Sequence, residues 1–472
     1  WLYALMAERI AANGFALPGE IPLFGPGGIP FAYPPFAFYM MAAVTEATGA
    51  PPFAYLRVVP PALLLASLVP MFFLARRVTD STTSAWWSTA LFGMAPSVTE
   101  MHNEGAGICR GLALLAMLWA IVCVDKSVAR PNAALLSLAV ALSSITVLTH
   151  PKYATFLALS TALLALRRPS RFGVLVGIGA ASALVVSPWV LYVIHVHGFR
   201  VFAMALETHD TFGFLHYLSH PQALAELLDA VLLRQGNILI AGATVLGIAV
   251  HVAARAWFPL VWMAATVLAM GITGARFVAI VGAILAATAI GLVCRGGSMS
   301  QPPHVPNGSF RTAFFVTVLL ATYVPSFAWS VRTTPINDPA LRTVAAWIQT
   351  NTAGDRTVLL ATDKWNEHEL FTFLTRRPPL VSPYGAEWTG SFQQQYRRLG
   401  QVVSCAHRGS YPCLEDRFRR WRLWPDVIVA PVDAPRSMSA ALDEASGWVR
   451  LHAEARYGVW VRSRNERART RP

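Results

Sequence analysis

A series of long apolar runs between residues 57 and 330 constrains the fold more than any other feature of the sequence. A helix that crosses the hydrocarbon core of a bilayer needs roughly 20 apolar residues, and most of the runs approach that length. The chain of 472 residues is 55% hydrophobic and 13% charged, which is too apolar for a soluble globular protein of this size. We therefore expect a polytopic membrane domain with about 10 to 11 helical spans. The candidate spans are 57–75, 84–98, 108–124, 132–149, 153–166, 172–194, 237–254, 257–273, 277–294 and 311–330.

The pattern changes near residue 335, where short helical and strand-like segments replace the long apolar runs. Residues 338–350 have the spacing of an amphipathic helix, and 427–430 read as a buried strand. The sequence thus predicts a mostly α-helical protein, with a polytopic membrane domain at 1–334 and a small soluble α/β domain at 335–472. Within the first domain we expect two outer loops. They are an interfacial first loop at 1–34, which begins with an amphipathic helix, and a long loop at 195–236.

Basic residues concentrate at the ends of the apolar runs, which suggests an orientation in the membrane. If the first span ends in the cytoplasm at Arg76 and Arg77, alternation of the spans satisfies the positive-inside rule. The other basic residues on that side would be Lys126, Arg130, Arg167, Arg168, Arg171, Arg255 and Arg295. Both outer loops, residues 96–110 and the C-terminal domain then face the extracytoplasmic side. This orientation depends most on the short run at 153–166. If that run does not cross the membrane, the sides assigned to part of the chain are reversed.

The net charge of +13 does not point to nucleic acid, because the basic residues flank membrane spans. Anionic membrane lipids are the partner that this arrangement favours. We expect an integral protein of a bacterial or archaeal plasma membrane. Cys405 and Cys413 fall in the extracytoplasmic domain, where a disulfide is permitted, whereas Cys109, Cys123 and Cys294 lie in or near spans as small apolar residues.

Residues 96–110 place acidic, imidazole and guanidinium groups between two apolar runs. Polar groups near a bilayer are costly, so such a cluster is a candidate functional site. One interpretation is a polar turn in which Glu100 and Glu104 cap the next helix. The other is that these carboxylates bind a divalent cation such as Mg²⁺ or Mn²⁺, or act as a general base with His102 nearby.

Other basic residues near the outer face have two interpretations each. The planar guanidinium of Arg276 suits a phosphate or diphosphate, but an arginine at a span end also extends toward lipid headgroups. The same two interpretations, a phosphate ligand or a charge that faces lipid headgroups, apply to Lys152 and Arg57, where the phosphate interpretation is weaker.

The long outer loop and the C-terminal domain hold further candidates. Glu387 and Trp388 are suited to meet a sugar-like ligand, or else they form a domain-packing motif. The loop brings five histidines and an aspartate together, of which His209 with Asp210 and His216 or His220 could ligate a metal, but their spacing matches no zinc signature and a solvated loop is favoured. These residues are His195, His197, His209, Asp210, His216 and His220.

The order of these features resembles the GT-C class of polytopic glycosyltransferases, the superfamily of the protein mannosyltransferases and aminoarabinose transferases. The resemblance covers most of the chain and rests on six segments. They are Tyr33-Pro-Pro, the run from Arg57 into the next span, H-N-E-G-A-G-I-C-R from His102 to Arg110, T-H-P-K from Thr149 to Lys152, Arg276, and G-A-E-W from Gly385 to Trp388.

The resemblance implies inverting transfer of a sugar from a polyprenyl-phosphate carrier to an extracytoplasmic glycan or protein acceptor, often with a divalent metal. It makes Glu100 and Glu104 the acidic second outer loop, which assists catalysis or metal binding with His102, and Arg276 the group that holds the carrier phosphate. The expected substrate-binding residues are Tyr33, Arg57, Arg110, His150, Lys152, Arg276, Glu387 and Trp388.

The class normally takes its catalytic base from an acidic residue in the first outer loop. Only Glu8 and Glu20 occur in that loop here, and neither stands at the matching position. The chain opens at Trp1 without a Met or a signal-like segment, so we expect residues upstream that include a first transmembrane helix and the principal base.

Two other classes of function remain open. A transporter or flippase for lipid-linked sugars would show internal repeats and broken helices with charges at the membrane midplane, and no clear repeat is found. A non-catalytic cell-envelope assembly protein would use the outer domain to bind a partner.

Overall fold

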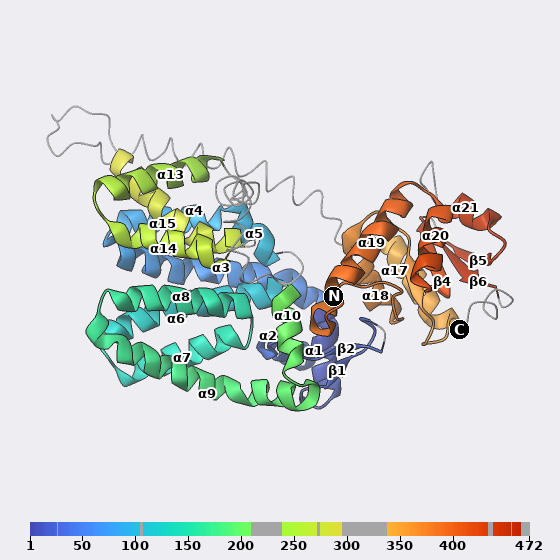
Figure 1. The fold of residues 1–472 in the computed structure, drawn as a ribbon, viewed down its shortest axis with the longest axis horizontal. Helices are drawn as coiled ribbons and strands as arrows, with labels where there is room; N and C mark the ends of the chain where they lie inside the picture. The colour runs from blue at the N-terminus through green and yellow to red at the C-terminus, as the bar shows by residue number, and fades with distance from the viewer. Residues whose placement is uncertain are drawn as a thin grey trace. The chain divides into compact units, whose positions relative to one another are not determined.

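The computed structural model describes residues 1–25, 27–103, 107–208, 238–270, 274–294, 338–432, 438–454 and 456–463 (Figure 1). The protein is mostly α-helical, as predicted. Its internal contacts divide it into two compact units. Unit 1 comprises Trp1–Tyr33, Tyr192–His209 and Pro335–Pro472, and unit 2 comprises Pro34–Leu191 and Asp210–Thr334. The first outer loop therefore groups with the C-terminal segment, whereas we expected it to belong with the rest of 1–334.

Unit 2 is a bundle of apolar helices in which α6, α7 and α8 lie side by side and α3 packs against α4 and α6 (Figure 1). The division between the units falls inside α9, after Leu191. The helices of this part are α2 (Phe36–Thr48), α3 (Pro52–Thr79), α4 (Thr82–Gly93), α5 (Pro96–Asn103), α6 (Gly107–Ala129), α7 (Ala133–Val147), α8 (Pro151–Leu166), η1 (Pro169–Arg171), α9 (Phe172–His197), α13 (Ile238–Ala253), α14 (Trp257–Met270) and α15 (Ala275–Cys294).

The length and surface of these helices fit a bilayer. Among the described residues, four helices are long and apolar enough to cross a membrane, namely Pro52–Thr79, Gly107–Ala129, Pro169–His197 and Ala275–Leu292. Leu184 and Leu191 of α9 are 75% and 63% exposed, although the helix is strongly apolar. Water disfavours such a surface, whereas lipid accommodates it. Four shorter apolar helices, α7, α8, α13 and α14, accompany them.

The predicted span at 84–98 is not one continuous helix, because the helix there is broken. Helix α4 ends at Gly93 after 12 residues, which is a length of about 18 Å. Helix α5 begins at Pro96, and a proline disfavours the helical conformation of the residue before it. The predicted span at 311–330 lies outside the described residues, and the count of about 10 to 11 spans stays a prediction.

Unit 1 contains a four-stranded sheet, which confirms a small α/β region near the C-terminus. The strand order is β3-β4-β6-β5, with β3 and β4 parallel and the other pairs antiparallel. The strands are β3 (Val358–Leu360), β4 (Val427–Pro431), β5 (Trp448–Ala453) and β6 (Tyr457–Arg462). The helices are α17 (Pro339–Asn351), α18 (Trp365–Thr375), η3 (Ala386–Thr389), α19 (Phe392–His407), α20 (Tyr411–Trp421) and α21 (Met438–Glu444).

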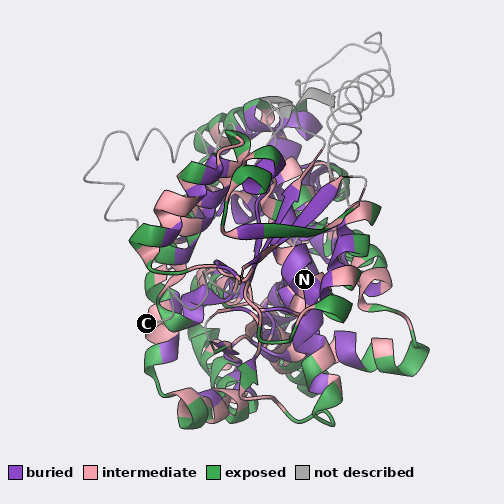
Figure 2. Ribbon diagram, turned by 90° about the vertical axis from the view of Figure 1, so that its right-hand side faces the viewer, coloured by how far each residue is buried: buried purple, intermediate pink, exposed green. Residues whose placement is uncertain are grey.

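Helices cover both faces of this sheet at β4, which explains the continuous apolar run of that strand. Val427 and Val429 of β4 belong to one apolar cluster with α17 and α18, while Ile428 belongs to another with α19, α20 and α21. Successive residues of a strand point to opposite faces, so a strand covered on both faces has no polar alternation. Figure 2 shows strands of this sheet in the colour of buried residues, as β3, β4 and β6 are, whereas β5 at the edge is mostly exposed.

The other elements of unit 1 come from the two expected outer loops. They are α1 (Leu2–Ala12), the hairpin of β1 (Glu20–Ile21) with β2 (Ile29–Pro30), and α10 (Arg200–Thr208). The apolar face of α1 is buried within the unit. The Arg376 guanidinium pairs with Glu8 at 2.8 Å, and Glu369 accepts from the backbone N–H of Leu2 at 2.8 Å. The disulfide that the sequence analysis permits between Cys405 and Cys413 is present.

Candidate functional site

The polar cluster of unit 2 begins where α5 approaches the start of α6. A Cβ atom at Gly107 would lie 2.4 Å from the carbonyl oxygen of His102 and 3.1 Å from Pro60, so only glycine fits. Tight approach at this point brings the first turn of α6 next to α5. Arg110 is thereby held beside Met101.

His102 is completely buried, and both of its ring nitrogens are hydrogen-bonded. Nδ1 lies 2.5 Å from the carbonyl oxygen of Val98, and since a carbonyl only accepts, Nδ1 carries the proton. Nε2 therefore accepts from the hydroxyl of Tyr153 at 2.6 Å. Burial lowers the pKa of His102 to about 3, which keeps the ring neutral. The imidazole links α5 to α8.

Arg276 is the buried cation of the cluster, with 7% of its surface exposed. Its guanidinium lies 5.2 Å from the ring centre of Tyr153 and 4.8 Å from that of Phe277. Nη1 lies 4.0 Å from the sulfur of Met101, and Nε has no hydrogen-bond partner. No acidic side chain among the described residues forms an ion pair with this buried charge, so an anion would be stabilised here.

Arg110 brings a second guanidinium to the same methionine. Its Nη1 donates to the Met101 carbonyl oxygen at 3.3 Å and lies 3.7 Å from the sulfur, and its Nε is buried without a partner. Arg276 and Arg110 thus meet at Met101, and their like charges repel unless a negative group lies between them. The N-terminus of α6 adds a partial positive charge beside Arg110.

The remaining candidates of unit 2 are placed differently. His150 caps the start of α8, where its Nδ1 accepts from the backbone N–H of Lys152 at 3.3 Å. Its ring also lies 5.1 Å from that of Tyr153, so the expected T-H-P-K segment does meet the cluster. Glu100 is exposed on α5, and Arg57 is exposed on α3 without a polar contact to the cluster within the described chain. Glu104 lies outside the described residues.

The predicted residues of unit 1 form a separate, buried group. The hydroxyl of Tyr33 donates to the carboxyl of Glu387, which is 8% exposed. The ring of Trp388 lies 4.8 Å from Tyr33 and 6.5 Å from Phe202. Burial raises the pKa of Glu387 and holds that of Tyr33 well above its usual value. Gly385, at φ +80°, provides the left-handed turn that precedes the pair. This arrangement fits the domain-packing alternative.

Metal ligands are not assembled in the described part of the chain. It contains no group of three or more His, Cys, Asp and Glu side chains that could hold an ion. His195 and His197 lie in the last turn of α9, and the other loop candidates, from His209 to His220, lie outside the described residues. A divalent metal at Glu100 and Glu104 therefore stays a prediction.

Sequence reasoning missed the residues that organise the cluster. Tyr153, Phe277 and Met101 contact the cations, yet none was a candidate. Tyr153 and Phe277 each directly follow a candidate cation, and an aromatic residue in that position is the signal that could have found them.

No protein-family profile matches the sequence, and no curated protein matches it. Solved structures do match. The oligosaccharyltransferase AglB from Archaeoglobus fulgidus, in complex with an inhibitory peptide and a dolichol-phosphate, is 14% identical, with a TM-score of 0.56 over 98% of this chain and 70% of AglB. ArnT from Cupriavidus metallidurans, bound to undecaprenyl phosphate, is 16% identical, with a TM-score of 0.56 over 98% of this chain and 93% of ArnT. AglB has also been solved in complex with Zn and sulfate, at 15% identity and a TM-score of 0.54 over 98% of this chain and 69% of that one. The chain therefore shares the fold of AglB and ArnT, which confirms the fold that the resemblance implies.

Proposed function

We propose that the protein transfers a sugar from a polyprenyl-phosphate carrier to an extracytoplasmic glycan or protein acceptor. The observation that carries the proposal is the meeting of Arg276 and Arg110 at Met101, with Arg276 buried and without an acidic partner among the described residues. AglB and ArnT share the fold and were solved with dolichol-phosphate and undecaprenyl phosphate, respectively. A lipid phosphate supplies the negative charge that the two guanidiniums lack.

In the proposed reaction, the acceptor hydroxyl oxygen attacks the anomeric carbon of the sugar. The bond from that carbon to the carrier phosphate breaks, the electron pair leaves with the phosphate, and the hydroxyl proton passes to a base. Attack from the face opposite the phosphate inverts the anomeric configuration. Arg276 and Arg110 stabilise the phosphate as its negative charge grows, which lowers the barrier because they are already oriented.

The candidate carboxylates, Glu100 and Glu104, lie close in the sequence to Arg110 of the proposed phosphate site. Glu100 directly precedes Met101 on the exposed side of α5 and is our candidate for binding the acceptor or receiving its proton. His102 holds Tyr153 in place through its hydrogen bond and is a positioning residue in this proposal. No step is assigned to a metal, because the described residues do not assemble its ligands.

The test compares Arg276→Gln and Arg110→Gln with Arg130→Gln, an exposed arginine just beyond the other end of α6. Binding of undecaprenyl phosphate to the purified protein is measured by native mass spectrometry. Sugar transfer is measured in membranes supplied with polyprenyl-phosphate sugars. Loss of a charged hydrogen-bonding partner is worth about 1.5–3 kcal/mol, so each site variant should bind roughly 10- to 100-fold more weakly.

Arg130→Gln should bind and turn over like the wild type. Unchanged binding and transfer in both site variants would refute the assignment. Binding of undecaprenyl phosphate by the wild type without transfer of any sugar would instead support the transporter or assembly alternatives.

A further inference from the structure

A hollow with a volume of about 480 Å³ lies at one end of unit 2, where α3, α6 and α8 end. Ligand pockets typically have volumes of about 300–1,000 Å³. We name this feature the basic hollow, because five basic side chains and only two acidic ones line it. The charged residues are Arg76, Arg77, Asp80, Asp125, Lys126, Arg167 and Arg168.

Ion pairing within the described chain neutralises only one of these five cations. Arg77 pairs with Asp125. Lys126 and Arg167 contact aromatic rings instead, at 5.9 Å from the ring centre of Phe73 and 4.9 Å from that of Phe258. Cations gathered in one place repel each other, and a bound anion reverses that cost.

Two general effects place basic residues at the ends of membrane helices. A cation in the last turn compensates the negative end of the helix dipole, and the positive-inside rule favours Lys and Arg on one side of the membrane. Neither effect requires the side chains to converge on one hollow. Arg130 and Arg171 have the same predicted side and are exposed, but they do not line it.

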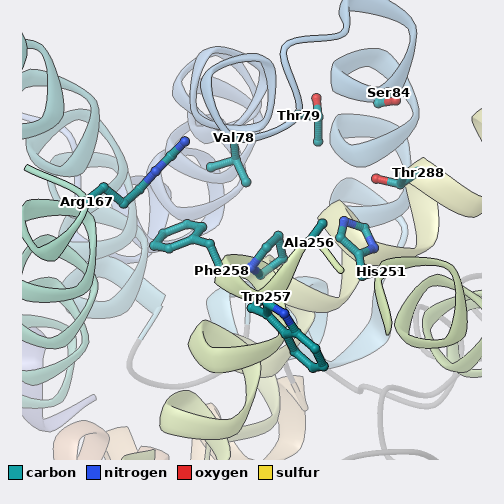
Figure 3. Close-up of a pocket in the computed structure, with 10 residues that line it drawn as sticks. Val78, Thr79, Ser84, Arg167, His251, Ala256, Trp257, Phe258 and Thr288 are labelled. Carbon is teal, nitrogen blue, oxygen red and sulfur yellow. The ribbon is translucent and has the colours of Figure 1, made fainter. Parts of the chain in front are cut away.

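A second hollow of about 360 Å³ shares Arg167 with the basic hollow. Val78, Phe258 and Trp257 form an apolar part of its wall next to the shared arginine, and the rest of the lining includes the polar residues Thr79, Ser84, His251 and Thr288. Figure 3 shows the side chain of Arg167 above the Phe258 ring, with Trp257 farther along the same wall. Trp257 is 57% exposed, as expected of a tryptophan at the level of the lipid headgroups.

We propose that the basic hollow binds the phosphate of an anionic phospholipid, and that the glycerol and first acyl carbons of this lipid lie against Phe258 and Trp257. The cations account for the negative headgroup, and the neighbouring apolar wall accounts for the rest of a lipid. Basic pockets between membrane helices bind such headgroups by this combination. A free phosphate would use the cations alone.

The experiment titrates the purified full chain in detergent with short-chain phosphatidylglycerol, short-chain phosphatidylcholine and inorganic phosphate, using native mass spectrometry. Arg76→Gln/Arg168→Gln removes two exposed charges from the basic hollow. Arg130→Gln/Arg171→Gln removes two exposed charges from the same predicted side but outside it. The pair of double variants is matched in net charge, so their difference isolates the hollow.

We expect the wild type to bind phosphatidylglycerol at least about ten-fold more tightly than the other two ligands. Removal of two contacting cations should weaken that binding on the order of 30-fold, whereas the matched control should change it by less than about three-fold. Equal weakening in both double variants would overturn the proposal in favour of a diffuse surface potential. Inorganic phosphate binding as tightly as phosphatidylglycerol would overturn the choice of a lipid. This ligand comparison uses the wild type, so it is decisive even if a variant fails to fold.

Discussion

Replacing Tyr33 with phenylalanine removes one hydroxyl from the buried contact that joins distant segments of unit 1. The hydroxyl donates to Glu387, 354 positions away in the sequence, and the carboxyl has little exposure to water that could replace this donor. A buried polar group that loses its partner costs about 1–3 kcal/mol. For a unit of this size, 1 kcal/mol shifts Tm by roughly 2–4 °C. With a central cost of about 2 kcal/mol, we expect Tyr33→Phe to lower Tm by about 4–8 °C.

The pH dependence provides a second readout of the same contact. Burial raises the pKa of Glu387 in the folded protein above its value in the unfolded chain. The stability that this carboxyl contributes is therefore fully present below the unfolded pKa, near 4.3, and is lost as the pH rises through the higher folded value. Glu387→Gln does not titrate, so its Tm should fall less than that of the wild type over this window. Tyr33 stays protonated throughout, because its own pKa is raised.

Thermal unfolding in detergent, followed by tryptophan fluorescence, measures both effects, since Trp388 packs against Tyr33. Tyr396→Phe is the matched control, because its side chain is 49% exposed and stacks on Phe392. That variant should stay within about 1 °C of the wild type. If Tyr33→Phe also changes Tm by no more than its control, the hydroxyl contributes nothing to stability and the reasoning fails.

Three further substitutions test contacts within unit 2 or within unit 1. Gly107→Ala should destabilise the start of α6 and weaken undecaprenyl phosphate binding, because the new Cβ would overlap the His102 carbonyl oxygen; Gly173→Ala, at an open position, is its control in the same binding assay. Tyr153→Phe should cost about 1–3 kcal/mol by leaving Nε2 of buried His102 without a donor, and thermal unfolding that matches the wild type would contradict this. Cys405→Ala/Cys413→Ala should lower the free energy of unfolding by about 2–3 kcal/mol relative to the wild type, because the unfolded chain is no longer constrained by the disulfide. Under reducing conditions, where the wild type also lacks the disulfide, this difference should disappear.

The sequence predicted those parts of the fold that depend on local pattern. Apolar length identified the long helices α3, α6, α9 and α15, and a strand-like run identified β4. The break between α4 and α5 was missed, although Pro96 marks it, because the hydropathy of 84–98 continues across the proline. A disulfide between Cys405 and Cys413 was expected as permitted because both residues fall in the predicted extracytoplasmic domain.

The candidate site was predicted less completely, because its contacts join residues far apart in the sequence. Arg276 was identified from its charge at the end of a span, and Arg110 from the polar cluster. Their meeting at Met101 depends on how α5, α6 and α15 pack, which periodicity does not specify. Glu387 and Tyr33 were both candidates, yet nothing in the sequence indicates that one donates to the other.

Helix α6 connects the two cationic sites proposed for unit 2 and determines their separation. Arg110 is in its first turn, and Lys126 lies 16 positions later, a distance of about 24 Å along the axis at 1.5 Å per residue. The hydrocarbon core of a bilayer is about 30 Å thick, so cations at these two positions suit headgroups on opposite faces. A phosphate held by Arg276 and Arg110 and one held in the basic hollow then belong to different leaflets. Arg76→Gln/Arg168→Gln should consequently leave undecaprenyl phosphate binding unchanged, and Arg276→Gln should leave phosphatidylglycerol binding unchanged. Loss of both ligands in either variant would show that the two sites are not independent.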